Sequence, residues 1–221
     1  MAKPKREKHI SPRGIALFPW LNKADTKFNV DGDYKVTLRV PATEAEAFIA
    51  KIDAEIELYR PTAMEKLKDP KVKASFKKAG KLNTDGSPHV HKPYSEVLND
   101  AGEETGEIDF AFKCPAVGKD KASGKTWKNK IVMFDAGKKE VTGVAVWGGS
   151  EIKVRCTMNA YLTTLAGLGV SLRMDAVQIF KLSQGGGASA AGFDEEEGEE
   201  IEAPSSEQSA GATSGDEETD F

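Results

Sequence analysis

The sequence contains few cysteines and histidines and has no long hydrophobic run. No segment approaches the roughly 18 consecutive apolar residues of a transmembrane helix, so we expect no membrane span. The basic residues 1–6 are not followed by the apolar stretch of a secretory signal, which favours a cytoplasmic protein. In that reducing compartment we expect Cys114 and Cys156 to be free thiols packed as small apolar residues, rather than a disulfide.

Motifs for catalysis and for metal binding are also absent. His89 and His91 could join the two cysteines around a metal, but their spacing matches no zinc pattern, so we expect neither a metal nor a cofactor. Residues 123–126 read Ser-Gly-Lys-Thr, like the end of a P-loop, but Lys119 stands where that motif needs glycine, and a strand follows in place of a helix. G-x-S-x-G and H-E-x-x-H do not occur. We therefore expect a binding protein and not an enzyme.

The charges are distributed very unevenly along the chain. The formal net charge is −4, but residues 194–221 hold 12 acidic residues and no lysine or arginine. Removing those 12 from the 35 acidic residues leaves 23 against 31 basic ones, so residues 1–193 carry a charge of +8. This asymmetry indicates a polyanionic partner for the basic part and a separate task for the acidic tail.

Strand patterns dominate residues 14–184. In residues 34–40 apolar and polar side chains alternate, which indicates a half-buried strand with Val36 and Leu38 facing inward. Further strands are predicted at 108–114, 128–135, 152–161 and 170–182, with a hairpin tip at 119–125.

One helix is predicted among these strands. Apolar residues recur at helical spacing over residues 44–60, and Thr43 with Glu46 resembles a capping box at the start. Pro61 is expected to end this helix, and residues 79–106 to form a long loop with short strand pieces. Several strands with one inserted helix favour a small, mainly β barrel over a parallel α/β sheet.

The composition divides the chain into three parts. Residues 1–13 form a basic N-terminal arm, expected to be loose, and residues 14–184 form the folded domain. Three glycines at 185–187 end that domain. The remainder of 185–221 is too poor in apolar residues to order itself, which predicts a flexible, disordered acidic tail.

The strand at 152–161 carries the most informative pattern for function. One face is apolar, and the other carries Lys153, Arg155, Thr157, Asn159 and Tyr161. Cations can hold phosphates and an aromatic ring can stack on bases of any sequence, as binding of a single strand requires. A solvated strand face with a tyrosine at its rim would give the same pattern, so this strand alone decides nothing.

Similar side chains recur on other predicted strands, which favours a nucleic-acid groove over scattered surface charge. Trp20 and Trp147 are more simply interpreted as core or rim residues. The residues predicted to bind DNA in addition to Lys153, Arg155 and Tyr161 are Lys35, Arg39, Lys113, Trp127, Lys128 and Lys130.

With these features in order, the chain resembles the single-stranded DNA-binding proteins of T7-like bacteriophages. The matching segments are 32–38, 110–114, 146–155, 160–161 and the terminal Asp220-Phe221. The resemblance implies an OB-type five-stranded antiparallel barrel with a helix packed on it. It also implies sequence-independent binding that protects and anneals single strands during phage DNA replication, recombination and repair in the bacterial host cytoplasm.

The resemblance further implies a homodimer and a tail that contacts the phage DNA polymerase and the helicase-primase. Tyr161 matches a DNA-contact tyrosine of the family. Pro115 departs from the family pattern, which often has an aromatic residue there, and Leu162 and Thr163 replace a basic-aromatic pair.

The tail ends in an aromatic residue, which can fill a small pocket of a partner while nearby carboxylates meet a basic rim. The residues predicted to bind partners are Asp216, Glu217, Glu218, Asp220 and Phe221. The alternative is an acidic-tailed scaffold or chaperone that binds basic proteins through its tail and does not bind DNA. The charge of +8 on residues 1–193 argues against it, because a tail-driven chaperone needs no basic barrel.

Overall fold

The computed structural model describes residues 7–120 and 123–183, and these residues form a mainly β fold with two helices. Neither helix in this described part combines the length and apolarity of a membrane span. The first half of the chain contains β1 His9–Ile10, β2 Gly14–Asp25, β3 Asp33–Pro41, α1 Ala42–Lys66, α2 Pro70–Lys78, β4 Val90–His91 and β5 Tyr94–Leu98. The second half contains β6 Glu104–Pro115, β7 Val117–Lys119, β8 Thr126–Lys128, β9 Val132–Phe134, β10 Glu140–Val141, β11 Glu151–Thr163 and β12 Gly167–Lys181.

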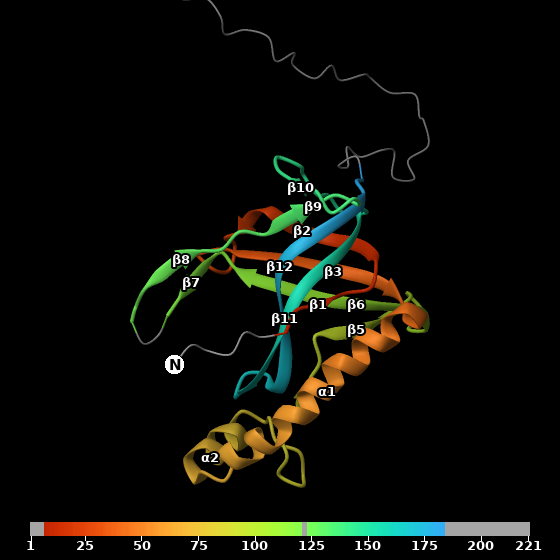
Figure 1. Cartoon of the computed structure of the whole chain (residues 1–221). Helices are drawn as coiled ribbons and strands as arrows, with labels where there is room; N and C mark the ends of the chain where they lie inside the picture. The colour runs from red at the N-terminus through yellow and green to blue at the C-terminus, as the bar shows by residue number, and fades with distance from the viewer. Residues whose placement is uncertain (1–6, 121–122, 184–221) are drawn as a thin grey trace, which may run out of the picture. The chain divides into compact units, whose positions relative to one another are not determined.

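Five long strands close into a barrel in the order β2-β3-β6-β12-β11, with β11 pairing back onto β2 (Figure 1). The predicted OB-type barrel is therefore confirmed. Four of the five pairings are antiparallel, and the β6–β12 pairing is parallel, so the barrel is not antiparallel throughout. Closure leaves the ring without a free edge, which protects its backbone hydrogen bonds.

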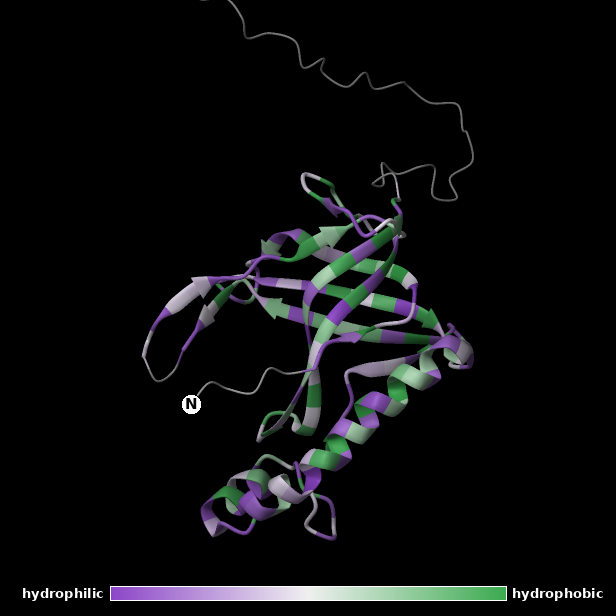
Figure 2. Cartoon of the chain, viewed as in Figure 1, coloured by the Kyte–Doolittle hydropathy of each residue, from purple (hydrophilic) through white to green (hydrophobic). Residues whose placement is uncertain are grey.

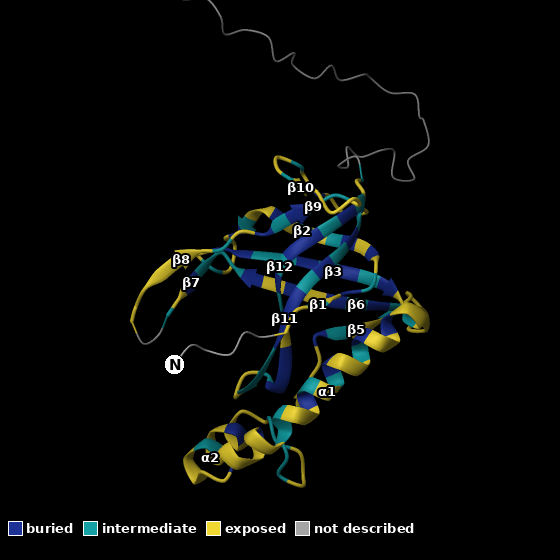
Figure 3. Ribbon diagram, viewed as in Figure 1, coloured by how far each residue is buried: buried dark blue, intermediate teal, exposed yellow. Residues whose placement is uncertain are grey.

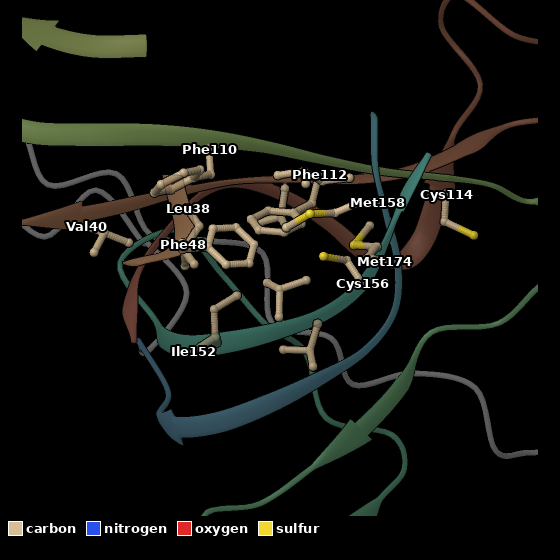
Figure 4. Close-up of a cluster of buried hydrophobic side chains, with 14 of the residues drawn as sticks. Leu38, Val40, Phe48, Phe110, Phe112, Cys114, Ile152, Cys156, Met158 and Met174 are labelled. Atoms are coloured by element: carbon tan, nitrogen blue, oxygen red, sulfur yellow. The ribbon is translucent and has the colours of Figure 1, made fainter. Parts of the chain in front are cut away.

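The barrel core follows from the period-two patterns. Val36 and Leu38 of β3 are buried as predicted, and hydrophobic and hydrophilic residues alternate along the barrel strands (Figures 2 and 3). Helix α1 packs Phe48 against the barrel, with its ring centroid 5.3 Å from that of Phe110 (Figure 4). Burying an aromatic side chain of this size contributes about 1.5–3 kcal/mol, so α1 is held by packing.

Both cysteines are free and buried, as expected. Burial raises the pKa of the Cys156 thiol to about 12. Burial also raises the pKa of Cys114, and the neighbouring Arg173 guanidinium offsets this only in part. Both groups therefore stay neutral at physiological pH and behave as small apolar side chains.

Helix α1 is longer than the sequence suggested. It begins at Ala42, with Pro41 as N-cap, and no side chain caps it, so the predicted capping box is wrong. Pro61 lies inside the helix, which continues to Lys66 because Ala63 is buried beyond it. Helix α2 starts with Pro70 at its first position, where the missing N–H costs nothing.

Three further regions differ from the predictions. Strand β2 was not predicted at all. The single strand expected at 128–135 is divided into β8 and β9. Part of the arm expected to be loose is attached to the barrel, because β1 pairs with β11 and Ser11 exchanges hydrogen bonds with Val154.

Candidate nucleic-acid interface

A concave surface with a volume of about 1030 Å³ lies between the β7–β8 hairpin and the outer faces of β11 and β12. We call it the hairpin groove. Four of its lining residues are basic and two, Asp120 and Asp175, are acidic. Its polar and aromatic lining residues include Lys8, Lys119, Trp127, Asn129, Lys130, Thr157, Asn159 and Arg173. The groove thus combines excess positive charge with an aromatic ring.

Trp127 is held in a fixed orientation at the wall of this groove. A Cβ on Gly118 would lie 2.3 Å from the Trp127 ring, so only glycine lets the indole pack against β7. The indole N–H donates a hydrogen bond to Asn129 Oδ1 at 3.1 Å, and Asn129 Nδ2 donates to the Pro115 carbonyl. The side chain is still 45% exposed, so it is both ordered and accessible, as a stacking platform must be.

A row of cations crosses the outer face of the barrel. Lys35 of β3 pairs in register with Lys113 of β6, which pairs with Arg173 of β12. Lys35 forms an ion pair with Asp25, and Lys113 forms one with Asp33 at 2.9 Å. Arg173 forms no ion pair with any residue that the structure describes, and it lines the hairpin groove. Arg173 was not among the residues predicted to bind DNA, although the alternation of Leu172, Arg173 and Met174 could have placed it outward.

Two further predicted DNA-binding cations, both arginines, are also bound to carboxylates on neighbouring strands. Arg39 donates two hydrogen bonds of 2.9 Å to Asp109, its direct partner in the register. Arg155 donates two to Asp175, which also binds Lys8. Burial raises the pKa of Asp175, but the hydrogen bonds from Arg155 and Lys8 outweigh it, so that the pKa is lowered overall. These arginines are ordered but already neutralised.

Lys153 and Arg155 line a second, smaller groove of about 250 Å³, together with Ile10, Phe134 and Gln178. Lys153 also lies over the ring of Phe180 at 5.6 Å. The ion-paired cluster of Lys8, Asp175 and Arg155 divides this groove from the hairpin groove, because its members line one or the other. Lys153 and Arg155 therefore lie in a different groove from Trp127 and Lys130.

Tyr161 lies beyond the hairpin groove, two residues along β11 from Asn159. It pairs with Gly169 of β12, where a Cβ would come within 2.7 Å of the Tyr161 hydroxyl, so the ring needs glycine beneath it. The hydroxyl forms a 2.8 Å hydrogen bond with His91 Nδ1, and burial raises its pKa. Its ring is thus supported by β12 and by β4, and it remains partly exposed.

The structure describes the remaining residues that were considered for DNA binding, but not those predicted to bind partner proteins. Lys128 is exposed on β8, next to Trp127, and has no ion pair within the described residues, while Lys130 lines the hairpin groove. Trp20 and Trp147 are exposed, so neither is a core residue, and they line neither groove. The partner-binding residues Asp216, Glu217, Glu218, Asp220 and Phe221 lie outside the described residues.

The sequence and the fold of the chain also match known proteins. The sequence model of the family described as the single-stranded DNA-binding protein of bacteriophage T7 matches residues 14–182. Among solved structures, the chain is similar to gp2.5, a single-stranded DNA-binding protein encoded by bacteriophage T7. The two sequences are 23% identical and the TM-score is 0.66. The match covers 90% of this chain and 100% of that chain.

It is also similar to the single-stranded DNA-binding protein from bacteriophage Enc34 in complex with ssDNA, with 12% identity and a TM-score of 0.52, covering 81% and 89% of the two chains. No curated protein matches the sequence. At these identities the solved structures establish the fold, and they confirm the architecture predicted from the sequence.

Proposed function

The chain belongs to the single-stranded DNA-binding protein family of bacteriophage T7, and we propose that it binds single-stranded DNA without sequence preference through the hairpin groove. The observation that carries this proposal is the position of Trp127 beside Lys130 and Arg173 in one groove. A ring can stack on any base, and the cations meet the phosphates on either side of it.

The bound strand would run from the hairpin groove along the outer face of β11. Thr157 and Asn159 line the groove, and Tyr161 follows two residues later on the same face. Bases stacked on Trp127 and Tyr161 would then be joined by backbone that passes Arg173. Arg39 and Arg155 could contribute only after exchanging their carboxylate partners for phosphates, since both are held in two-bonded pairs.

A fluorescence titration tests this function directly. Adding an oligothymidylate should quench tryptophan emission of the wild type, because Trp127 is exposed in the groove. In Trp127→Phe most of the quenching should disappear while anisotropy of a labelled oligonucleotide still reports binding, because the phenyl ring retains stacking. If the wild type neither quenches nor changes anisotropy at low salt, the proposal is wrong.

The resemblance supports a wider role in phage DNA replication, recombination and repair, in which the protein protects and anneals single strands in the host cytoplasm. We propose that it acts as a homodimer and that the tail ending in Phe221 recruits the phage DNA polymerase and helicase-primase. The alternative, an acidic-tailed chaperone for basic proteins, predicts that deletion of residues 194–221 abolishes all binding. The DNA-binding proposal predicts that this deletion leaves DNA binding in place.

A further inference from the structure

A lysine-rich segment leaves the barrel where α1 ends and α2 begins, and it takes no part in the site described above. Residues 66–81 contain seven lysines and one acidic residue, Asp69. All the lysines of α2 are exposed, and the helix is mostly hydrophilic on its surface (Figures 2 and 3). We call residues 66–81 the lysine arm.

The interior of the lysine arm explains its fold but not its charge. Phe76, at 3% exposed, and Leu67, at 4%, are buried. Asp69 caps α2 by accepting a hydrogen bond from the Lys71 backbone N–H at 2.8 Å. These contacts hold α2 in place, and none of them uses a lysine ammonium group.

Helix stability does not account for the lysines either. Lys77 and Lys78 lie in the last turn of α2, where cations are favourable to the helix dipole. Lys71 and Lys73 lie at the opposite end, where the dipole disfavours them, and the first turn contains no acidic residue. Helix α2 has no acidic residue at all that could pair with them four positions away.

The ion pairs of the described residues leave these charges uncompensated. Lys68 pairs with Glu65, and Lys66 donates to the Tyr59 hydroxyl. The four lysines of α2 form no ion pair with any other part of the chain that the structure describes. A cluster of exposed cations without partners attracts a polyanion.

The lysine arm connects directly to the Tyr161 end of the proposed site. The His89 N–H donates to the Lys81 carbonyl, and the His89 carbonyl accepts from the Leu168 N–H in β12. Two residues further, His91 binds the Tyr161 hydroxyl. A DNA strand that passes over Tyr161 therefore leaves the barrel beside the segment that follows α2 (Figure 1).

The lysine arm lacks what base recognition needs. Its one aromatic residue, Phe76, is buried, so no ring is available for stacking. Lysines alone contact phosphates as point charges. We propose that Lys71, Lys73, Lys77 and Lys78 bind the sugar-phosphate backbone of the same single strand after it passes Tyr161, and so lengthen the binding site beyond the barrel. This inference rests on the proposed function.

The test compares two oligothymidylate lengths, because only a long strand can reach past the barrel. An OB-type domain covers roughly 4–16 nucleotides, so labelled strands of about 6 and about 25 nucleotides separate the two regions. In the variant with all four lysines of α2 changed to Gln, affinity for the short strand should stay within about twofold of the wild type. Affinity for the long strand should fall about tenfold or more. The log–log salt slope for that strand should become shallower by up to about 3, because each lost phosphate contact removes roughly 0.7.

The matched control changes the same four lysines to Arg, which keeps the charges and should keep long-strand binding. A second, milder variant combines Lys71→Gln with Lys73→Gln. We expect it to fold as well as the wild type, because it removes two cations from the end of the helix where the dipole disfavours them. Unchanged long-strand affinity in the Gln variants would overturn the inference, as would an equal loss on both lengths, which would indicate a general field effect. A wild type that binds neither length would refute the proposed function itself.

Discussion

Tyr161→Ala is the substitution that tests most directly whether the strand follows β11 beyond the hairpin groove. The ring lies over Gly169 and is braced by His91, so the folded protein already holds it in place before DNA arrives. Removing a base-stacking aromatic ring costs about 1–3 kcal/mol of binding, which corresponds to about a 5- to 150-fold loss of affinity. The ring is partly exposed and contributes little to the core, so the melting temperature should change by only a few degrees.

Tyr161→Phe separates the ring from its hydroxyl. The phenyl ring still stacks, but the 2.8 Å hydrogen bond with His91 is lost. A net hydrogen bond contributes about 0.5–1.5 kcal/mol to stability, and His91 is exposed and can bind water instead, so we expect a stability loss at the low end of that range and a DNA affinity close to that of the wild type. His91→Ala should have the same small effect, and adding it to Tyr161→Phe should cost nothing more, since both changes remove one interaction.

The assay is anisotropy of a labelled oligothymidylate at fixed salt, with circular dichroism melts to show that each variant is folded. Wild-type affinity in a folded Tyr161→Ala protein would show that the strand does not pass over this ring. If the Phe variant binds as poorly as the Ala variant, the hydroxyl is what matters and the stacking role of Tyr161 is wrong.

Four further predictions concern charge and the tail. Arg173→Gln should weaken single-strand binding several-fold and lower the log–log salt slope by about 0.7, which a salt titration measures and an unchanged slope would contradict. Deleting residues 194–221 should tighten DNA binding, most visibly at low salt, because a tethered polyanion competes for the same cations; weaker binding there would rule out autoinhibition. Deleting Phe221 alone should abolish capture of the phage polymerase in a pull-down while DNA affinity stays close to wild type, whereas full capture would leave the tail only its charge. The lowered pKa of Asp175 predicts that the wild type melts above Asp175→Asn near pH 6, and that this advantage disappears as the pH falls below about 4, through the folded-state pKa; a gap that persists at low pH would contradict it.

The sequence predicted strands well where a single regular face is buried. In β3 the alternation runs without interruption from Val36 to Val40, and in β11 from Ile152 to Cys156, so orientation could be assigned there from the pattern alone. The pattern fails at Thr157, which was predicted to face outward but is buried next to a register shift between Arg155 and Cys156. Strand β2 escaped detection because its pattern is broken. Phe18 has a φ of 49°, Pro19 follows it, and the register with β3 shifts between Leu17 and Trp20. A bulge of this kind reverses which side chains face inward, and no local rule of alternation can follow it.

The candidate site was predicted less completely, because its energetics depend on cross-strand neighbours. Lys35, Arg39 and Arg155 were predicted to point outward, and they are part-exposed on the outer face. That Arg39 faces Asp109 could not be predicted, since the two residues meet only through the β3–β6 register. The support of Trp127 by Gly118 depends likewise on the pairing of β7 with β8, and a glycine gives no sequence signal for the ring it accommodates.

The distinction between paired and unpaired cations decides what a salt titration of this protein should measure. The salt slope counts the phosphates that the protein neutralises, because each of them releases condensed cations from the DNA, and a guanidinium already held by a carboxylate is not free to neutralise one. Arg39 and Arg155 should therefore add little to the slope, although they lie on the face predicted to bind DNA. Three basic residues that line the hairpin groove, Lys119, Lys130 and Arg173, form no ion pair within the described residues, and neither does Lys128 beside it on β8. At roughly 0.7 per contact these four give a slope of about −3 on a short strand, and the four lysines of α2 would double it on a long one. A slope that is the same for both lengths would confine the phosphate contacts to the barrel.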